Sequence, residues 1–547
     1  MPTSVEQPAG SLSPRRRQAI LVVVGLALMM VVSAVSGLNV ALPSLARDTG
    51  ATQSEIQWIV DAYTVVFAGL LLVAGAIGDR YGRRVILLVG LGLFGGAAAV
   101  ALGVDEPGVL IALRAVMGVG AAAVMPVTLS IITTSFPPEE RARAVGVWVG
   151  ITGGGAVIGL LGSGVLLEFF GWSSFFALNV ALAVAAFVGA LAVIPASREA
   201  RPPALDVLGA LLSLVSISTI VFGFIEGPER GWDDGLTVSA FVVGVAAVIG
   251  FVLWELCTPE PLLDPRLFRL RGFGTGSLAL TVQFFAAFGL FYTALQYLQF
   301  VAGLSPLQAA AALLPLPAVL IPLARRAPVL AERYGVNRIG AAGLVLVAVG
   351  LVVLSTVGVD FAYWRFGLGL VIFAAGMGLT ATPATTAIVS SLAASKQGVA
   401  SAVNDTAREL GSALGIAILG SILNATYRNG LEPAVGSLPD GVAAGALGSI
   451  AFVQSGVVEQ LGPAGDPLVA AARQAFVDGV SAALLWASVI VVVASVIVAV
   501  RAPRAGEVEH HAVSAAIGDA VDPTGALRSG AVDRGPTPPA ARRPIAG

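Results

Sequence analysis

A charged turn between two long apolar runs constrains the fold of this chain more than any other feature. Residues 75–84 read Gly-Ala-Ile-Gly-Asp-Arg-Tyr-Gly-Arg-Arg. Much later the chain repeats an acid, an arginine and Tyr-Gly at Glu332–Gly335, followed by Arg338, again between two apolar runs. Because the same turn recurs in the same setting, the sequence predicts a membrane protein built from two related halves.

The composition supports this class. Of the 547 residues, 56% are hydrophobic and 12% are charged, whereas a soluble domain is about 25% charged. The mean hydropathy is +0.89, and a single soluble core stops growing near ~250–300 residues. Repeated apolar runs of about 18 residues or more instead fit helices that span a bilayer. We therefore expect an all-α membrane protein that has the lipid bilayer as a partner.

Scarce residue types exclude several function classes. Cys257 is the single cysteine, and His510 and His511 are the two histidines, so we expect no internal disulfide and no zinc or haem site. Lys396 is the one lysine and follows Ser395, so a phosphate-binding Gly-Lys-Ser/Thr loop is excluded. No basic patch interleaved with aromatics suggests nucleic acid. The sequence thus predicts no cofactor, no ATP-binding motif and no enzymatic activity.

Hydropathy, with Gly, Pro and charge clusters as breakers, predicts fourteen membrane spans. Their expected limits are 18–43, 55–77, 84–104, 108–134, 143–168, 173–194, 206–226, 237–256, 274–300, 305–327, 337–357, 364–390, 398–424 and 476–500. The first span follows Arg15–Arg17 and is interpreted as an uncleaved helix. Most basic residues fall in turns on one side, so the positive-inside rule puts both termini in the cytoplasm.

The spans divide the chain into five parts. We expect a cytoplasmic segment at 1–17, a six-helix domain at 18–194, two additional helices at 206–256, a second six-helix domain at 274–500 and a disordered cytoplasmic tail at 505–547. The second domain is expected to carry a long outer loop at 425–475, with a possible helix near Leu468–Arg473. An alanine- and arginine-rich, lysine-poor chain indicates a bacterial cytoplasmic membrane protein.

Three polar residues are predicted to lie at one depth inside the membrane. Asp61, Arg114 and Asn39 fall in three different spans, at ~9 Å below the outer boundary for the two charges, counting ~1.5 Å per residue. A charge inside the bilayer costs ~2.5–3.5 kcal/mol on insertion scales, so it must face a cavity or a partner. We therefore expect these residues to form one site.

Asp61 lies on a polar or small helical stripe with Gln57, Thr64 and Ala68. One interpretation is that Asp61 pairs with Arg114 and only neutralises a structural charge. The other is that Asp61 carries a proton, with its protonation set by burial and by its distance to Arg114. Arg114 stays charged in both cases and is not the titrating group.

Aromatic and amide residues of the ninth span are candidate substrate contacts. The predicted substrate cavity consists of Asn39, Gln57, Thr64, Gln283, Phe284, Phe288 and Tyr292. Aromatic rings can stack on flat apolar or cationic ligands, although core packing is the alternative interpretation. Near the inner end of the thirteenth span, Asn404, Asp405 and Arg408 are expected to have structural roles.

Several motifs resemble those of the major facilitator superfamily. The turn at 75–84 resembles its signature between spans 2 and 3, and 114–120 resembles the span-4 signature of its proton-coupled members. The fourteen-span drug:proton antiporter branch is similar at Asn39–Pro43, Trp58–Tyr63, the glycines of 153–164, and 398–420. The chain departs from that branch at Ala34, where an aspartate is usual, at Leu160, where a proline is usual, and at Met117, where a glutamine is usual.

The resemblance implies that the repeated turn is a conformational gate. The acid–arginine latch would join the two halves, with Asp79 in one and Glu332 in the other. Its residues would be Gly75, Asp79, Arg80, Gly82, Arg83, Arg84, Glu332 and Arg333. The alternative is that the arginines only orient the chain in the membrane, but Asp79 is superfluous for that purpose.

Together these features predict a monomeric secondary active transporter. It would export small hydrophobic or cationic compounds, such as drugs or antibiotics, in exchange for protons, by alternating access to a mid-membrane site. One alternative is a proton-coupled importer or uniporter of a nutrient, and another is a membrane sensor or scaffold that does not transport. An exporter should lower the cellular accumulation of a dye until an uncoupler collapses the gradient.

Overall fold

The computed structural model describes residues 13–195, 206–259, 261–392, 397–436, 438–454 and 465–504. Every regular element within these ranges is helical, which confirms the predicted all-α class. The first twelve residues and the predicted tail at 505–547 lie outside the described ranges.

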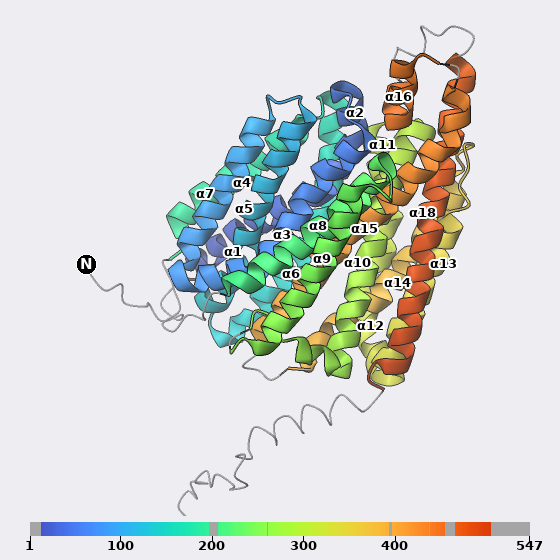
Figure 1. The fold of residues 1–547 in the computed structure, drawn as a ribbon. Helices are drawn as coiled ribbons and strands as arrows, with labels where there is room; N and C mark the ends of the chain where they lie inside the picture. The colour runs from blue at the N-terminus through green and yellow to red at the C-terminus, as the bar shows by residue number, and fades with distance from the viewer. Residues whose placement is uncertain are drawn as a thin grey trace, which may run out of the picture.

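The first half of the chain forms seven helices, followed by a separate pair. The helices are α1 (Pro14–Ser36), α2 (Leu38–Thr49), α3 (Gln53–Tyr81), α4 (Arg83–Ala101), α5 (Pro107–Ser135), α6 (Pro138–Phe169) and α7 (Ser174–Val193). The pair consists of α8 (Val207–Arg230) and α9 (Gly235–Cys257). Helix α8 packs against both α3 and α15, so the pair lies along the junction between the two halves (Figure 1).

The second half begins with the short helix η2 (Pro265–Arg269). It continues through α10 (Arg271–Gln296), the π-helix η3 (Tyr297–Val301), α11 (Pro306–Ala312), α12 (Pro315–Tyr334), α13 (Val336–Leu354), α14 (Tyr363–Ser390), α15 (Gln397–Val435), α16 (Asp440–Gly448), α17 (Ile450–Val453) and α18 (Gly465–Arg501). The elements η3 and α11 belong to the predicted ninth and tenth spans, which are therefore irregular at one end.

Twelve segments in the described ranges are long and apolar enough to cross a membrane. Helices α3 and α6, of 29 and 32 residues, stand where the second and fifth spans are predicted. The total of fourteen crossings remains a prediction. Residues near the two chain termini make contacts on one side of the molecule. Arg16 Nε donates to the Val193 carbonyl, and the Asn337 N–H donates to the Pro503 carbonyl. We call this side the terminal face and the opposite side, which carries α16, the far face (Figure 1).

The repeated turn has the same backbone geometry in both halves. Gly82 ends α3 with φ 108° and ψ 126°, and Gly335 ends α12 with φ 95° and ψ 143°. Positive φ is strained for a residue with a Cβ, which explains why glycine follows tyrosine in both copies. The repeat seen in the sequence is therefore a repeat of structure.

The segment 425–475 contains much more helix than the sequence predicts. Helix α15 continues to Val435, α18 begins at Gly465, and α16 and α17 lie between them. Helices α15 and α18 have 39 and 37 residues, and ~20 residues suffice to cross a bilayer, so they extend beyond the membrane. Hydropathy falls there, but packing continues: the Tyr427 hydroxyl donates to the Ala446 carbonyl, and its ring lies 6.3 Å from that of Phe476.

Candidate functional site

Amide side chains join two groups of helices near the far face. The first group is α1–α7 and the second is α10–α18, with η3. Gln53 Nε2 of α3 donates to the Tyr292 hydroxyl of α10 at 2.8 Å and to Gln296 Oε1 at 3.3 Å. One turn along α3, Gln57 Nε2 lies 3.3 Å from two carbonyl oxygens of α15. Helix α3 is thus hydrogen-bonded to two helices of the other group.

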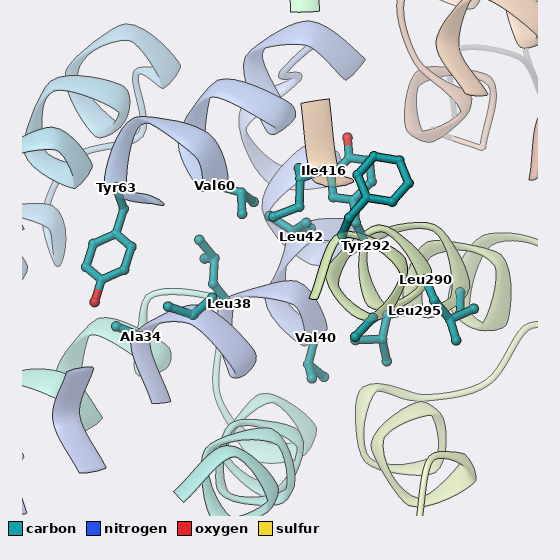
Figure 2. Close-up of a cluster of buried hydrophobic side chains, with 14 of the residues drawn as sticks. Ala34, Leu38, Val40, Leu42, Val60, Tyr63, Leu290, Tyr292, Leu295 and Ile416 are labelled. Carbon is teal, nitrogen blue, oxygen red and sulfur yellow. The ribbon is translucent and has the colours of Figure 1, made fainter. Parts of the chain in front are cut away.

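Two further bonds complete this contact. Gln299 Nε2 donates to the Val40 carbonyl at 3.0 Å, and Asn424 Nδ2 donates to Ser54 Oγ at 3.4 Å. We name the far-face seam by its residues, which are Gln53, Gln57, Tyr292, Gln296, Gln299 and Asn424. Apolar side chains fill the space beside it, with Leu42, Ile416 and Tyr292 gathered between the groups (Figure 2). These hydrogen bonds and apolar contacts hold the two groups together at the far face, which is closed in this conformation.

Asp61 lies deep in the bundle, one turn from Gln57 on the same stripe of α3. It is fully buried, and its Oδ1 accepts a hydrogen bond from Thr64 Oγ1 at 3.1 Å. Its Oδ2 has no hydrogen-bond partner. Asp61 also interacts electrostatically with Tyr292 of the opposite group. The predicted stripe of Gln57, Asp61 and Thr64 therefore faces the junction of the two groups.

Arg114 of α5 lies on the other side of α3. Its Nε donates to the Ile59 carbonyl at 2.9 Å, and its guanidinium carbon lies 4.4 Å from the centre of the Tyr63 ring. The two Nη atoms have no hydrogen-bond partner although the residue is fully buried. The pairing with Asp61, one of the two interpretations of the sequence, is therefore absent. Ile59 and Tyr63 share a helical face, and Asp61 stands two residues away, or ~200° around the helix.

Ala34 lies beside Tyr63 (Figure 2), and Asn39 makes no hydrogen bond to Asp61 or Arg114. Ala34 is fully buried and the Tyr63 side chain points toward it (Figure 2), while the Tyr63 hydroxyl donates to the Val31 carbonyl. Asn39 Nδ2 is bonded to the Val35 carbonyl of its own chain segment, and its Oδ1 has no partner. Helix α1, α3 and α5 are thereby held together around Tyr63.

The aromatic residues of α10 form a ladder. The Phe284 and Phe288 rings stack at 6.0 Å with an interplanar angle of 19°, and the Phe291 ring meets Phe288 edge-on at 5.9 Å. All three are half-buried, as expected of residues that could line a passage. Two predicted cavity residues differ: Gln283 Nε2 donates to the Met377 carbonyl within its own helix group, and Tyr292 belongs to the seam.

A charged cluster on α15 lies beside the ladder and includes an acid that the sequence analysis missed. The Arg408 guanidinium carbon lies 5.1 Å from the centre of the Phe284 ring. Asp405 is buried and bonded to Asn404, and the half-buried Glu409 interacts electrostatically with Asp405 and Arg408 and with Tyr63 of the first group. Glu409 is ten residues beyond Val399, or about 15 Å along the helix, so it lies well inside the span.

Several predicted gate residues at the terminal face have contacts within their own helix group. Gly75 and Gly78 pack against Pro126 and Val127 of α5. Arg84 Nη2 donates to the Leu191 carbonyl at 2.7 Å, so in this conformation Arg84 caps α7 inside its own group. Other gate residues, Arg80, Glu332 and Arg333, are exposed, whereas Arg83 is buried. The Asp79 side chain lies outside the described residues, so the latch stays a prediction.

Breaking the far-face seam should make that face open more readily. Tyr292→Phe removes the hydroxyl that accepts from Gln53 and leaves the ring in place, so a neutral hydrogen bond worth about 0.5–1.5 kcal/mol is lost. A cysteine in place of Leu42, in a Cys257→Ser background, should then react about two- to tenfold faster with an impermeant maleimide. Thr293→Val, which removes a bond inside α10, is the matched control. Equal rates in both variants would mean that the seam does not hold the face closed.

The chain is similar to known membrane proteins over most of its length. The model of the Major Facilitator Superfamily matches residues 24–416. The multidrug efflux pump LfrA of Mycolicibacterium smegmatis is 32% identical over 92% of this chain and 100% of its own length. The puromycin resistance protein of Streptomyces alboniger is 34% identical over 80% of this chain and 88% of its own.

Other similarities point the same way. The tetracenomycin C resistance and export protein of Streptomyces glaucescens is 30% identical over 76% of this chain and 77% of its own length. Among solved structures, a bacterial homologue of the human lysosomal transporter Spinster superposes with a TM-score of 0.59 at 18% identity, covering 89% of this chain and 98% of that one. At this identity the structure supports the fold alone.

Proposed function

This chain belongs to the major facilitator superfamily, and on that premise we propose that it exports small hydrophobic or cationic drugs in exchange for protons. The observation that carries the proposal is Asp61, a buried carboxyl with one unpartnered oxygen, placed directly under a closed seam of neutral amides. The efflux and resistance functions in the names of the similar proteins support the direction of transport. The other participants would be protons and the lipid bilayer, and the protein would act as a monomer.

Alternating access explains how these parts would work together. With the far face closed, a buried Asp61 without a cationic partner is best accommodated with a proton on Oδ2, since an unpaired buried charge is costly. Opening the seam would admit water and let Asp61 release or take up its proton. Because Gln57 lies one turn from Asp61 on the same stripe, the proton site and the seam would move together.

The aromatic ladder and the α15 cluster are the proposed substrate contacts. Phe284, Phe288 and Phe291 offer flat apolar surfaces on which an aromatic drug can stack. Glu409 supplies a negative charge inside the span, opposed by Arg408, which already lies over Phe284. A hydrophobic cation would satisfy both features, with its ring on the ladder and its charge near Glu409.

The terminal face is the proposed cytoplasmic side, following the distribution of arginines. In the inward-closed state, the Asp79 turn and the Glu332 turn would meet and form the latch. Glu332 and Arg333 are exposed in the present conformation, which leaves them available for such a contact. The gate and the closed far-face seam would then alternate during the cycle.

Removing the charge of Glu409 should select against cationic substrates. Glu409→Gln preserves size and hydrogen bonding but not charge, so export of a monovalent cationic dye should fall about tenfold, as expected for ~1.4 kcal/mol. Export of a neutral substrate of similar shape should change little. The exposed Glu432→Gln is the matched control, and an equal loss for both substrates would assign Glu409 to structure instead.

The proposed function is tested with purified protein in proteoliposomes. An imposed proton gradient should drive a cationic dye such as ethidium against its own gradient, and an uncoupler should stop the movement. Movement in the direction of the protons would indicate an importer, movement without regard to the gradient a uniporter, and no movement a sensor or scaffold. Any of these results would overturn the proposed antiport.

A further inference from the structure

A second buried carboxyl site lies outside the proposed substrate pathway, at the terminal ends of α8 and α9. Glu255 of α9 is 1% exposed, and its Oε1 has no hydrogen-bond partner. Asp206, which precedes α8, is also buried. Glu255 Oε1 and Asp206 Oδ2 each lie 2.6 Å from the point that a Cβ on Gly209 would occupy. This places the two oxygens within about 5 Å, where one carboxylate opposes the ionisation of another.

The two acids are bonded unequally. Asp206 Oδ1 accepts from the Gly209 N–H at 2.8 Å, and the Trp254 indole N–H lies 2.9 and 3.0 Å from its two oxygens. Glu255 Oε2 accepts a longer bond, from the Leu263 N–H at 3.3 Å, and the Leu262 backbone also acts on this carboxyl, more weakly than that of Leu263. Donors stabilise an ionised carboxylate, so Asp206 is the better site for the negative charge and Glu255 for a proton.

The other charged groups around the pair do not neutralise it. Asp264 adds a further negative charge that acts on Glu255. Arg266 directs Nη2 to the Leu256 carbonyl at 3.1 Å, and its backbone N–H bonds to Asp264. A bound Ca²⁺ or Mg²⁺ requires about six oxygen ligands, whereas Glu255 Oε1 is the one carboxylate oxygen of this pair without a hydrogen-bond partner. A proton on Glu255 Oε1 needs only one acceptor, and Asp206 Oδ2 is a carboxylate oxygen within about 5 Å of it.

We propose that Asp206 and Glu255 share one proton, and that this acid pair fastens α8 to α9 at the terminal face. The shared proton would give the orphaned Oε1 a partner and hold the segment from Glu255 through Leu263 to η2, which leads into α10. When pH rises and the proton leaves, two adjacent carboxylates repel each other, so the link weakens. The stabilisation is therefore present at low pH and lost as pH rises. If the terminal face is cytoplasmic, the pair responds to cytoplasmic pH.

The single native cysteine reports on this site directly. Cys257 is exposed and lies two residues after Glu255, so a nitroxide label there senses the mobility of the α9 end in the full-length protein in detergent. In the wild type, label mobility should increase severalfold as pH is raised. Glu255→Gln keeps an N–H donor toward Asp206 and does not titrate, so its label should stay immobile throughout the pH range. Glu226→Gln, at the opposite end of α8, should behave like the wild type.

Infrared difference spectra between low and high pH provide the second readout. The C=O stretching band of the protonated Glu255 carboxyl should disappear in Glu255→Gln. It should remain in Glu226→Gln and Asp61→Asn, which can lose only the band of the acid that each of them replaces. An unchanged spectrum in Glu255→Gln would mean that both acids are ionised and would overturn the proposal. So would label mobility that responds to calcium, magnesium or a chelator in the wild type, since a metal ion would then hold the pair. Neither readout depends on drug export.

Discussion

Asp61→Asn should abolish proton-driven drug export and leave the protein folded and able to bind substrate. The substitution preserves shape and the hydrogen bond from Thr64 Oγ1, and it removes the only group at this position that can bind and release a proton. Since Asp61 is buried without a cationic partner, loss of its charge should not destabilise the bundle. Export should therefore fall to the background of liposomes without protein.

The measurement uses an imposed proton gradient and a fluorescent cation in proteoliposomes, with binding followed separately by fluorescence anisotropy. Asp105→Asn, an exposed acid between α4 and α5, is the matched control and should transport normally. In Asp61→Asn the substrate should still move down its own gradient, because downhill movement needs no energy from a proton gradient. Uphill export by Asp61→Asn at a wild-type rate would assign the proton to another acid, with Glu409 the next candidate.

The sequence was sufficient for the fold class and for the burial of Asp61. Length and hydropathy of the apolar runs determine helices in a bilayer, and Tyr-Gly in each charged turn marks Gly82 and Gly335, two of the five positive-φ glycines in the described residues. Asp61 could be predicted as buried because it lies inside an apolar span, ~9 Å from its outer end. These features depend on local sequence, where periodicity and depth are informative.

The absence of an ion pair between Asp61 and Arg114 has a simple geometric cause. Counting residues from the end of a span gives depth, but a contact also requires the correct side of the helix. Arg114 reaches Ile59 and Tyr63, which are four residues apart and share a face, whereas Asp61 points to the opposite side. The packing of α5 against α3 decides this, and no pattern in one sequence reveals which neighbour a helix face meets.

The far-face seam was largely missed because its members are neutral. A search for charges inside the membrane does not detect Gln53, Gln296, Gln299 or Asn424, although amides in a bilayer also need partners. The spacing of Gln53 and Gln57 by four residues was an available signal, since it places both on one face. Their partners come from the other helix group, so the contact itself required the structure.

Glu409 was missed for a different reason. Glu409 directly follows Asn404, Asp405 and Arg408, which are expected to have structural roles near the inner end of the span 398–424, and nothing in the local pattern sets it apart from them. In the structure α15 has 39 residues, and Glu409 lies well inside it. The long continuation of α15 toward the far face, which hydropathy could not predict, also shows that low hydropathy marks the limit of the membrane and not the limit of a helix.

Arg114→Met should separate the stability of the protein from its transport activity. Removing a charge from the membrane interior relieves about 2.5–3.5 kcal/mol on insertion scales. The same change loses a hydrogen bond from a charged donor, about 1.5–3 kcal/mol, and a cation–π contact with Tyr63 of about 1–2 kcal/mol. The gains and losses nearly cancel, and methionine fills much of the volume, so the melting temperature in detergent should change little.

Transport should nevertheless fall about tenfold or more, equivalent to ~1.4 kcal/mol of barrier. Arg114 binds the face of α3 opposite Asp61, through the Ile59 carbonyl and the Tyr63 ring, and so fixes the rotation of α3 that points Asp61 toward the seam. It also keeps a fixed positive charge on the far side of that helix. Arg114→Lys should be intermediate, because lysine retains the charge but not the planar group that donates and stacks at once.

The control is Arg365→Met, at the exposed start of α14, which should leave both transport and stability unchanged. The decisive comparison is between melting and proton-driven export measured on the same preparation of Arg114→Met. A variant that melts normally and pumps normally would reduce Arg114 to a packing residue. A variant that melts normally and fails to pump, while Tyr63→Phe still pumps, would assign the effect to the guanidinium itself and not to the hydroxyl that Tyr63 extends to α1.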